Sequence, residues 1–560
     1  MHVKKTNSSQ ESLYGSARFA TWKDIQRSGL AANEGLYQGE FDDNGKTITL
    51  LSPANSLIFA AETGERKLDL IVEQLLTSRE SIYVSDRLAR YSAITIGNQA
   101  ALNKKAYCFF DDESRLNRAP WFLIAEKINP LSVLIPDHPE LKKRALRVAG
   151  ILINPGRELT SVQIKDDLEK ARSWFADLMC WLIKSNNRII DLPEVYDLIR
   201  LIEGNPPQWD RILEQQMVSG GNPQFRQLAQ DMRITRARQP NNYIRVIAFL
   251  HSSLEYLEQA SLRTKLSREG RKLEEIIGEG FTFYNCSKLN ELQSLFAITL
   301  MMAKQDQLGD GGTLLVMLDE RARLGQLEQA DGSYIDDQNN NIVIEEFWSS
   351  LSEMRKLLGE SGMHDRLSRF SVQHYHTMDT YSAGLVSRML GTATIKYKSS
   401  RAKMQDDQLN ASIALAVLKG KDPLEEVVRA NAQKDTYDVQ ARALKKPEEL
   451  ENMPLDRKIM LFKHIDCPPI EGRWKSYKSK TYLHGLYLPD PRYPPYNQIV
   501  VSGKRGRELT RRLIITDIPA SLRNFPQYAN GLRAVVEPSE KLFKNIQKIW
   551  KKPHFSDLGN

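Results

Sequence analysis

The chain has 560 residues, of which 41% are hydrophobic and 26% charged, and a net charge of +8. This composition is typical of a soluble globular protein, and the length allows two or more domains. The four cysteines form no Cys-x-x-Cys pair, which argues against a zinc site or disulfide framework and favours a reducing compartment. No apolar run approaches the roughly 20 residues of a membrane-spanning helix, and no signal peptide is predicted.

Positive charge is concentrated near the C-terminus. From residue 500 onward the chain has 12 Lys or Arg against 5 Asp or Glu. The candidates here for contacting nucleic acid or a partner are Lys504, Arg505, Arg507, Arg511 and Arg512. A basic segment can bind a phosphate backbone or an anionic membrane face, and it can equally be a solvated surface. Both interpretations stay open.

The first predicted element is a β-hairpin. Residues 35–51 alternate apolar and polar side chains about Asn44-Gly45, a strong signal for a tight turn. The tripeptide Gly45-Lys46-Thr47 resembles the end of a phosphate-binding loop. However, Gly39 stands one residue too far upstream, and the tripeptide leads into a strand rather than a helix. The hairpin is therefore not predicted to bind a nucleotide.

Residues 55–76, NSLIFAAETGERKLDLIVEQLL, have the layout of a phosphate-binding loop. A buried strand is predicted at Leu57–Ala61, followed by a turn with one glycine and a helix with an apolar stripe. Further strands are predicted at Ser81–Ser85 and Ala106–Phe110, with a helix between them. This alternation predicts a parallel α/β sheet.

The pattern becomes helical from residue 136 to 262, where apolar residues recur at helical spacing. Alternation of strands and helices then resumes, with a strand at 280–286 and a helix at 287–305. A buried strand follows at 313–318, and shorter strands at 341–345 and 369–374. The helical stretch is therefore predicted to be an all-α insertion in an α/β domain.

The buried strand at 313–318 ends in Asp319-Glu320, which is the form of a Walker B strand. In such a strand the Asp orders Mg²⁺ and the Glu polarises the attacking water. Apolar strands that end in acids are also common where no nucleotide binds. In one parallel sheet, the turn after Ala61 and Asp319 would share the carboxyl edge, where α/β proteins bind ligands. Asp319 and Glu320 are the catalytic candidates, either as a working pair or as a vestige.

Seven segments, in this order, resemble the type IV secretion coupling proteins, the conjugative DNA-transfer ATPases. Residues 13–30 are similar to a lead-in motif centred on Gly15-Ser16-Ala17-Arg18. The other segments are 55–76 at the Walker A position, 81–93, 128–134, 316–327, 385–395 and 442–454. The resemblance covers residues 13–495. It implies a RecA-like P-loop NTPase-type core with an inserted all-α domain, and ring-forming subunits that bind nucleotide between them.

The Walker A position departs from the family pattern. The degenerate loop offers Thr63, Gly64, Arg66 and Lys67 as its nucleotide-binding candidates. Counted back from the following helix, Arg66 stands at the lysine and Lys67 at the Ser/Thr that holds Mg²⁺. Glu65 replaces the second glycine, which puts a side chain and a negative charge where the phosphates approach. No register of this turn restores the motif.

Neighbouring positions have changed as well. Asp86 matches an acid of the family, but the four residues after it do not. Glu345 and Glu346 stand where the family has a Gln. The family's N-terminal membrane hairpin has no counterpart before residue 13, so membrane anchoring is not carried over from the resemblance, and association with the membrane through a partner stays open. Separately, His374 and His376 share one face of a strand, but no third metal ligand is evident, so no metal site is predicted.

The predicted organisation has five parts. These are a lead-in segment and hairpin at 1–50, the first part of a RecA-like domain at 51–135, an all-α domain at 136–265, the second part of the RecA-like domain at 266–495, and a basic tail at 496–560. The fold class is α/β.

The leading functional hypothesis is a coupling-protein-like component of a type IV secretion or conjugation system that lacks its own ATP hydrolysis, a pseudo-ATPase. It would recruit substrates or other subunits, among them an intact coupling ATPase or DNA, and no cofactor is expected. The alternatives are a DNA-translocating ATPase that binds Mg-ATP at an unorthodox site, and a cytoplasmic nucleic-acid-binding protein. The expected location is the cytoplasm or the inner face of the bacterial inner membrane.

Overall fold

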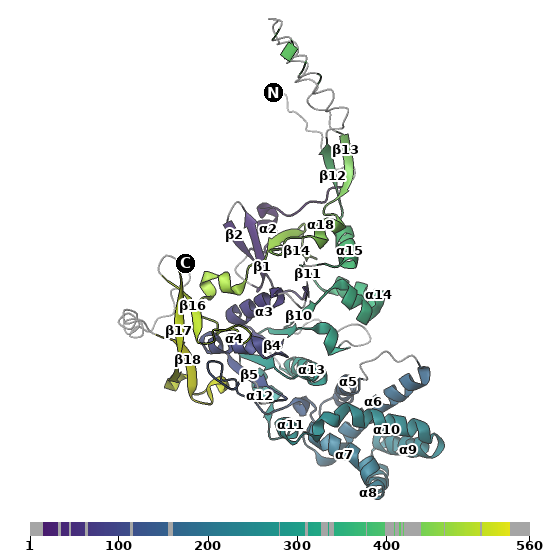
Figure 1. Cartoon of the computed structure of the whole chain (residues 1–560). Coiled ribbons are helices and arrows are strands. Elements are labelled where there is room, and N and C mark those ends of the chain that lie inside the picture. Colours follow the sequence, from purple (N-terminus) through teal and green to yellow (C-terminus); the bar gives the residue numbers. More distant parts are fainter. Residues whose placement is uncertain are drawn as a thin grey trace.

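The computed structural model describes residues 15–31, 35–43, 46–61, 65–112, 116–154, 161–278, 280–307, 312–325, 327, 334, 341–376, 378–397, 438–463, 465–503 and 507–537, and the single positions 408, 411, 414, 415 and 418. Its centre is an eleven-stranded sheet with the strand order β2-β1-β15-β14-β11-β3-β10-β9-β4-β8-β5 (Figure 1). Helices cover both faces of this sheet, so the chain has the predicted α/β fold.

Seven neighbouring strands of the sheet pair in parallel. In spatial order they are β11 (Val372–Tyr375), β3 (Ser56–Phe59), β10 (Ile342–Trp348), β9 (Leu314–Leu318), β4 (Ser81–Ser85), β8 (Phe281–Asn285) and β5 (Lys105–Phe109). They confirm the strands predicted between residues 57 and 374, with small shifts at the ends. Because the strands are parallel, their carboxyl ends meet at one edge.

Four antiparallel strands extend the sheet beyond β11: β14 (Arg457–Phe462), β15 (Ile470–Arg473), β1 (Leu36–Asp43) and β2 (Lys46–Ser52). Strands β1 and β2 are the predicted hairpin. Lys46 and Thr47 begin β2 rather than a helix, as predicted, whereas Asn44 and Gly45 lie outside the described residues.

Successive side chains of each strand point to opposite faces of the sheet and pack into two hydrophobic cores, one on each face. Ile58 packs with α3 (Arg66–Thr77) and α4 (Arg90–Gln99) on one face. Leu57 and Phe59 point to the opposite face, which α13 (Asn290–Asp306) covers. The other helices around the sheet are α2 (Trp22–Ser28), α12 (Leu273–Ile277), α14 (Leu351–Arg369), α15 (Thr380–Leu390) and α18 (Pro447–Glu451).

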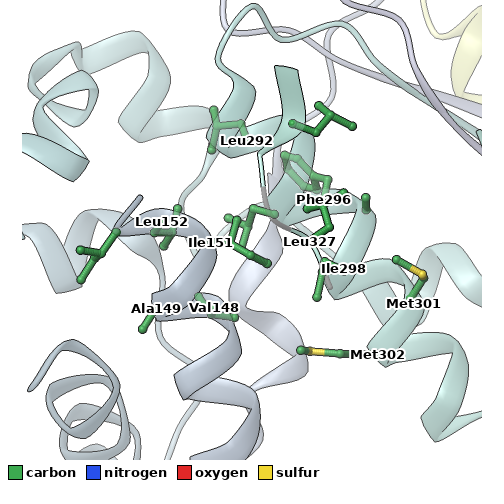
Figure 2. Close-up of a cluster of buried hydrophobic side chains, with 14 of the residues drawn as sticks. Val148, Ala149, Ile151, Leu152, Leu292, Phe296, Ile298, Met301, Met302 and Leu327 are labelled. Atoms are coloured by element: carbon green, nitrogen blue, oxygen red, sulfur yellow. The ribbon is translucent and has the colours of Figure 1, made fainter. Parts of the chain in front are cut away.

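A bundle of helices lies between β5 and β8 in the sequence, where the all-α insertion was predicted. It comprises α5 (Leu141–Leu152), α6 (Val162–Asn186), α7 (Leu192–Gly204), α8 (Pro206–Arg211), α9 (Pro223–Arg238), α10 (Pro240–Leu254) and α11 (Ala260–Lys265). Figure 2 shows α5 packed on α13 through Val148, Ile151, Phe296 and Met302. The domain boundaries themselves stay a prediction. Among the described residues, no helix is long and apolar enough to span a bilayer.

The lead-in segment pairs with β12 (Thr392–Tyr397), which in turn pairs with β13 (Asp438–Ala443) (Figure 1). Ala17 N–H donates to Thr392 O at 3.0 Å. A Cβ on Gly15, whose φ is +142°, would lie 2.2 Å from the same oxygen, so only glycine fits there. Two segments that resemble the coupling-protein family, 13–30 and 385–395, therefore meet in space.

Within the predicted basic tail, the described residues 498–503 and 507–537 contain three strands. These strands, β16 (Gln498–Ser502), β17 (Glu508–Asp517) and β18 (Leu532–Val536), pair as an antiparallel sheet. Leu513 joins the core of α3 and α4, and Ala106 N–H donates to Gln527 Oε1 at 2.9 Å.

Candidate functional site

A pocket of about 270 Å³ lies at the carboxyl edge of the parallel strands. It is enclosed by the ends of β4 and β9 and the first turns of α3, α4 and α13, and it is the kind of crevice where α/β sheets bind ligands. Its charged lining residues are Lys67, Asp86, Arg87, Arg90, Asp319, Glu320, Arg323 and Arg492. The structure therefore brings together three of the predicted site residues, namely Lys67, Asp319 and Glu320.

The other predicted site residues lie elsewhere. Arg66 occupies the first position of α3 but does not line the pocket, and burial lowers the pKa of its guanidinium. Arg507 precedes β17, and Arg511 and Arg512 lie within that strand. Thr63, Gly64, Lys504 and Arg505 lie outside the described residues.

Asp319 has donors on both of its carboxylate oxygens. The Lys67 ammonium lies 2.9 Å from Oδ1, and the backbone N–H of Glu320 donates to the same oxygen at 2.8 Å. The Tyr91 hydroxyl donates to Oδ2 at 2.6 Å. Burial and the charge of Asp319 raise the pKa of Tyr91 well above its usual value, so this donor keeps its proton. Both carboxylate oxygens of Asp319 thus already accept from groups of the protein itself.

Glu320 is held between two guanidinium groups. Its Oε2 lies 2.9 Å from Arg323 Nε and 3.6 Å from an Arg87 nitrogen. Its backbone has a φ of +51°, in the left-handed region that non-glycine residues seldom adopt. Both acids of the predicted Walker B pair are therefore engaged in ion pairs.

Asp86 caps helix α4. Its carboxylate accepts the backbone N–H groups of Arg90, Tyr91 and Ser92 at 2.7–3.1 Å, and the Ser92 hydroxyl at 2.6 Å. These bonds satisfy amides that the first turn of a helix leaves unpaired. Burial raises the pKa of Asp86 to about 6. Its position at the pocket is thus explained by its role as a cap.

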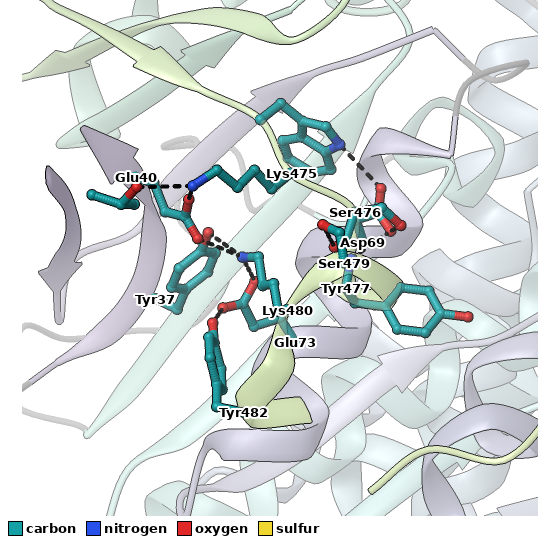
Figure 3. A network of polar contacts seen from close by, with 12 residues as sticks. Tyr37, Glu40, Asp69, Glu73, Lys475, Ser476, Tyr477, Ser479, Lys480 and Tyr482 are labelled. Carbon is teal, nitrogen blue, oxygen red and sulfur yellow. Dashed lines mark hydrogen bonds and ion pairs between the residues drawn. The ribbon is translucent and has the colours of Figure 1, made fainter. Parts of the chain in front are cut away.

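A segment that we call the strap, residues 474–496, crosses α3 and α4. Asp69 of α3 accepts bonds from Trp474 and Ser476, and Glu73, one turn further, contacts Lys480 and Tyr482 (Figure 3). Tyr477 and Tyr487 of the strap are buried, whereas Tyr482 and Tyr493 are exposed. Part of the alternation of aromatic and basic residues in the strap therefore reflects packing on α3.

Arg90 ties the strap to the start of α3. Its guanidinium donates to Asp490 of the strap at 3.0 Å and to Glu65 at 2.9 Å. Asp490 also accepts the backbone N–H of Arg492 at 3.0 Å, which fixes the turn that carries Arg492 to the pocket. Sequence reasoning missed Arg492, Asp490 and Tyr91, because no local pattern pairs residues hundreds of positions apart.

The acids of β10 are buried inside the protein. Glu346 lies 2.8 Å from Arg366 and accepts the Trp348 indole N–H at 2.8 Å. Glu345 accepts from Gln74 of α3 at 2.9 Å, and its burial raises the pKa to about 7. Neither residue lines the pocket.

The two histidines of β11 are also buried. Burial lowers the pKa of both His374 and His376 well below the usual value, so both are neutral. His374 Nε2 lies 2.8 Å from Gln38 Oε1. Within the described part of the chain, no three His, Cys, Asp or Glu residues gather as a metal site would require.

Comparisons with known proteins agree with this architecture. Solved structures of the bacterial conjugative coupling protein TrwBdeltaN70 (unbound monoclinic form) and of plasmid coupling protein TrwB with ADP and Mg²⁺ match with TM-scores of 0.55 and 0.54. Each is 11% identical; the matches cover 82% of this chain, and 93% and 94% of theirs. At this identity the likeness shows a shared fold. A comparison with curated protein sequences gives no match.

A family profile described as "Type IV secretory system Conjugative DNA transfer" matches residues 125–484. This span is more than half of the chain and includes the helical bundle, β9 with Asp319 and the first part of the strap. The chain therefore belongs to the conjugative DNA-transfer family of type IV secretory systems, as the resemblance predicted.

Proposed function

We propose that this family member acts in conjugative DNA transfer as a coupling-protein-like component that does not hydrolyse ATP, and that it recruits substrate or other secretion subunits. The observation that carries the proposal is the ion pair of Lys67 with Asp319, at 2.9 Å. In a phosphate-binding loop, a Ser or Thr hydroxyl and the Walker B Asp together hold Mg²⁺. Here an ammonium group stands in place of that hydroxyl.

The described residues do not fit Mg²⁺ in this position. Both oxygens of Asp319 already accept protein donors. A divalent cation about 4 Å from the Lys67 ammonium would be repelled by about 8 kcal/mol at an effective dielectric of 20. Glu320, which would polarise the attacking water, is paired with Arg323 and Arg87. The arrangement supports a site that has lost Mg²⁺-dependent hydrolysis.

A second candidate function is a DNA-translocating ATPase with an unorthodox site. The observation in its favour is that a pocket is present at this edge of the sheet and that Lys67, Asp319 and Glu320 all line it. For this candidate, Lys67 would have to release Asp319 when Mg-ATP binds. The electrostatic cost given above makes this the weaker proposal.

Calorimetric titration of the full chain with Mg-ATP, with and without DNA, distinguishes the two proposals. The recruitment proposal predicts no Mg²⁺-dependent ATP binding. Micromolar Mg-ATP binding that Asp319→Ala abolishes would sink it.

Recruitment itself is tested by co-purification from cells that carry the secretion system. The proposal predicts that another secretion subunit or DNA is retained on the tagged chain. A chain that purifies alone from such cells would argue for the ATPase or for a function outside secretion.

A further inference from the structure

The sequence shortly after β18 carries a pattern that the proposed function does not use. Residues 539–552, which we call the amphipathic segment, read SEKLFKNIQKIWKK and lie outside the described residues. Apolar side chains recur in it at the spacing of one helix face, at Leu542, Phe543, Ile546, Ile549 and Trp550. Lysines recur at the complementary spacing, at Lys541, Lys544, Lys548, Lys551 and Lys552.

The apolar side chains and the lysines separate cleanly on a helix. At about 100° per residue, the apolar set spans an arc of about 120°, and the lysines span an opposite arc of about 100°. Asn545 and Gln547 fall at the two borders between these arcs. Ser539 is a favoured N-cap residue at the start of the segment. The sequence therefore predicts a basic amphipathic helix.

The two faces of this predicted helix distinguish between anionic partners. A DNA backbone would attract the lysines but would leave the apolar face in water. The surface of an anionic bilayer satisfies both faces, because lysines pair with the headgroups while Leu, Phe, Ile and Trp enter the boundary with the acyl chains. Trp is particularly favoured at the level of the headgroups. The composition thus favours a lipid surface over nucleic acid.

The structure fixes the point where the amphipathic segment is attached. Glu537 is the last described residue before it, and its backbone N–H donates to Arg512 O of β17 at 2.8 Å. The sheet of β16, β17 and β18 is itself packed on the body of the protein, since Leu513, Ala534 and Val536 join the core of α3 and α4. The segment is therefore attached beside Arg512 on a firmly packed sheet.

The charge of this sheet region argues against a partner within the chain. Residues 498–537 contain seven Lys or Arg against three Asp or Glu, and Arg507, Arg512 and Arg523 are exposed. A region with this excess of positive charge repels the lysine face of the segment, and the same region of a second copy would repel it too. An anionic surface would attract the sheet and the segment together.

We propose that the amphipathic segment binds the surface of an anionic phospholipid bilayer, with its apolar face among the headgroups and Arg512 as a further contact. The segment would lie in the plane of the interface rather than cross the bilayer. The family profile ends at residue 484, so this membrane contact belongs to a part of the chain that the profile does not match. The inference does not depend on whether the pocket binds Mg-ATP.

The test is co-sedimentation of the full chain with lipid vesicles. One set contains phosphatidylcholine alone, and the other contains phosphatidylcholine with about 30% phosphatidylglycerol. Binding to the anionic vesicles is expected to be saturable, at least about tenfold tighter than to phosphatidylcholine, and weaker as salt is raised. No binding to the anionic vesicles, or equal binding to both sets, would overturn the inference.

The apolar face is tested by the double change Phe543→Ser and Trp550→Ser. It should weaken binding to the anionic vesicles by more than about tenfold, because it removes two of the largest apolar side chains from the predicted face. The matched control is Ile244→Ser with Leu455→Ser, which changes two exposed apolar residues elsewhere and should leave binding unchanged. Equal losses in the two double variants would contradict the assigned segment.

The basic face is tested by Lys544→Gln with Lys548→Gln, which should weaken binding to the anionic vesicles by about thirtyfold. The single change Arg512→Gln should weaken it by about fivefold, whereas Arg238→Gln, at an exposed position of α9, should not. Equal effects of the two arginine changes would show that Arg512 is not a contact.

Two further outcomes separate this inference from the other proposals. If the lysine pair weakens binding of duplex DNA while neither segment variant affects vesicle binding, the partner is nucleic acid and the inference is wrong. Vesicle binding by a chain that hydrolyses Mg-ATP would refute only the proposed function. A chain that neither hydrolyses ATP nor binds anionic vesicles would refute only this inference.

Discussion

Lys67 determines what the carboxyl end of β9 can do. A hydroxyl at this position would share a metal with Asp319, but an ammonium neutralises Asp319 directly at 2.9 Å. The sequence identified both residues as candidates and placed Lys67 at the hydroxyl position. It did not predict that they pair, and it did not identify Tyr91, whose hydroxyl bonds to Asp319 from α4. Such partners become visible only when the topology brings distant segments to one edge.

Glu345 predicts a measurable pH dependence. Burial raises its pKa to about 7 in the folded protein, whereas an unfolded Glu titrates at about 4.3. The unfolded chain therefore releases this proton first, and the free energy of unfolding falls as pH rises between these values. Glu345→Gln cannot titrate and keeps an oxygen for Gln74. Its stability relative to the natural chain should rise by about 3 kcal/mol between about pH 4 and about pH 8.

Urea denaturation at several pH values measures this difference. The control is Glu508→Gln, the same replacement at an exposed residue of β17, measured at the same pH values. A pH-independent effect of Glu345→Gln would show that burial does not raise the pKa of Glu345.

At the scale of elements, the strap holds the first turns of α3 and α4 in place. Arg90 bonds both Asp490 of the strap and Glu65 before α3, and Asp69 and Glu73 bind the strap along α3 (Figure 3). These contacts fix the wall of the pocket that carries Arg492. The strap therefore contributes to the pocket as well as to the stability of the core.

Asp490→Ala tests this contribution. The change leaves the largely buried Arg90 guanidinium with Glu65 as its remaining carboxylate partner among the contacts described above. Breaking a buried pair in this way costs about 3 kcal/mol. Chemical denaturation measures the loss, and limited proteolysis should cut the strap faster. The control Asp517→Ala, at an exposed position of β17, should change stability by less than about 0.5 kcal/mol. Equal stabilities of the two variants would mean that the strap is held without this pair.

The parallel strands and their helices were predictable because long apolar runs alternate with helical periodicity. Strand β4 lies at the predicted residues, and β3 and β5 differ from prediction only at their ends. The strands β14 to β18 were not predicted. They pair antiparallel with segments that the local pattern does not reveal, as β15 does with β1. Charge counting also concealed the folded sheet within residues 498–536.

At the scale of the whole molecule, the folded C-terminal sheet changes how DNA binding should be tested. Deletion from residue 500 would remove Leu513 from the core and Gln527 from β5, so its effect would not isolate charge. Replacing Arg507, Arg511 and Arg512 together with Ala keeps the apolar packing. If this surface binds DNA, the slope of log K against log salt should become shallower by up to about 3, at about 0.9 per phosphate contact.

Fluorescence anisotropy with duplex DNA across a salt series measures this slope. A matched control replaces three arginines of the helical bundle, Arg226, Arg233 and Arg238. An unchanged slope in the β17 variant would show that these three arginines do not bind DNA. A change in slope only in the control would indicate that DNA binds the helical bundle.

We propose above all that the Walker-like site of this conjugative DNA-transfer family member no longer uses Mg-ATP, because the Lys67 ammonium forms an ion pair with Asp319. The most direct test is the release of phosphate from ATP by the full chain in Mg²⁺ and DNA, measured beside Asp319→Ala. The claim predicts that both proteins release phosphate at the same background rate. Mg²⁺-dependent release by the natural chain that disappears in Asp319→Ala would contradict it.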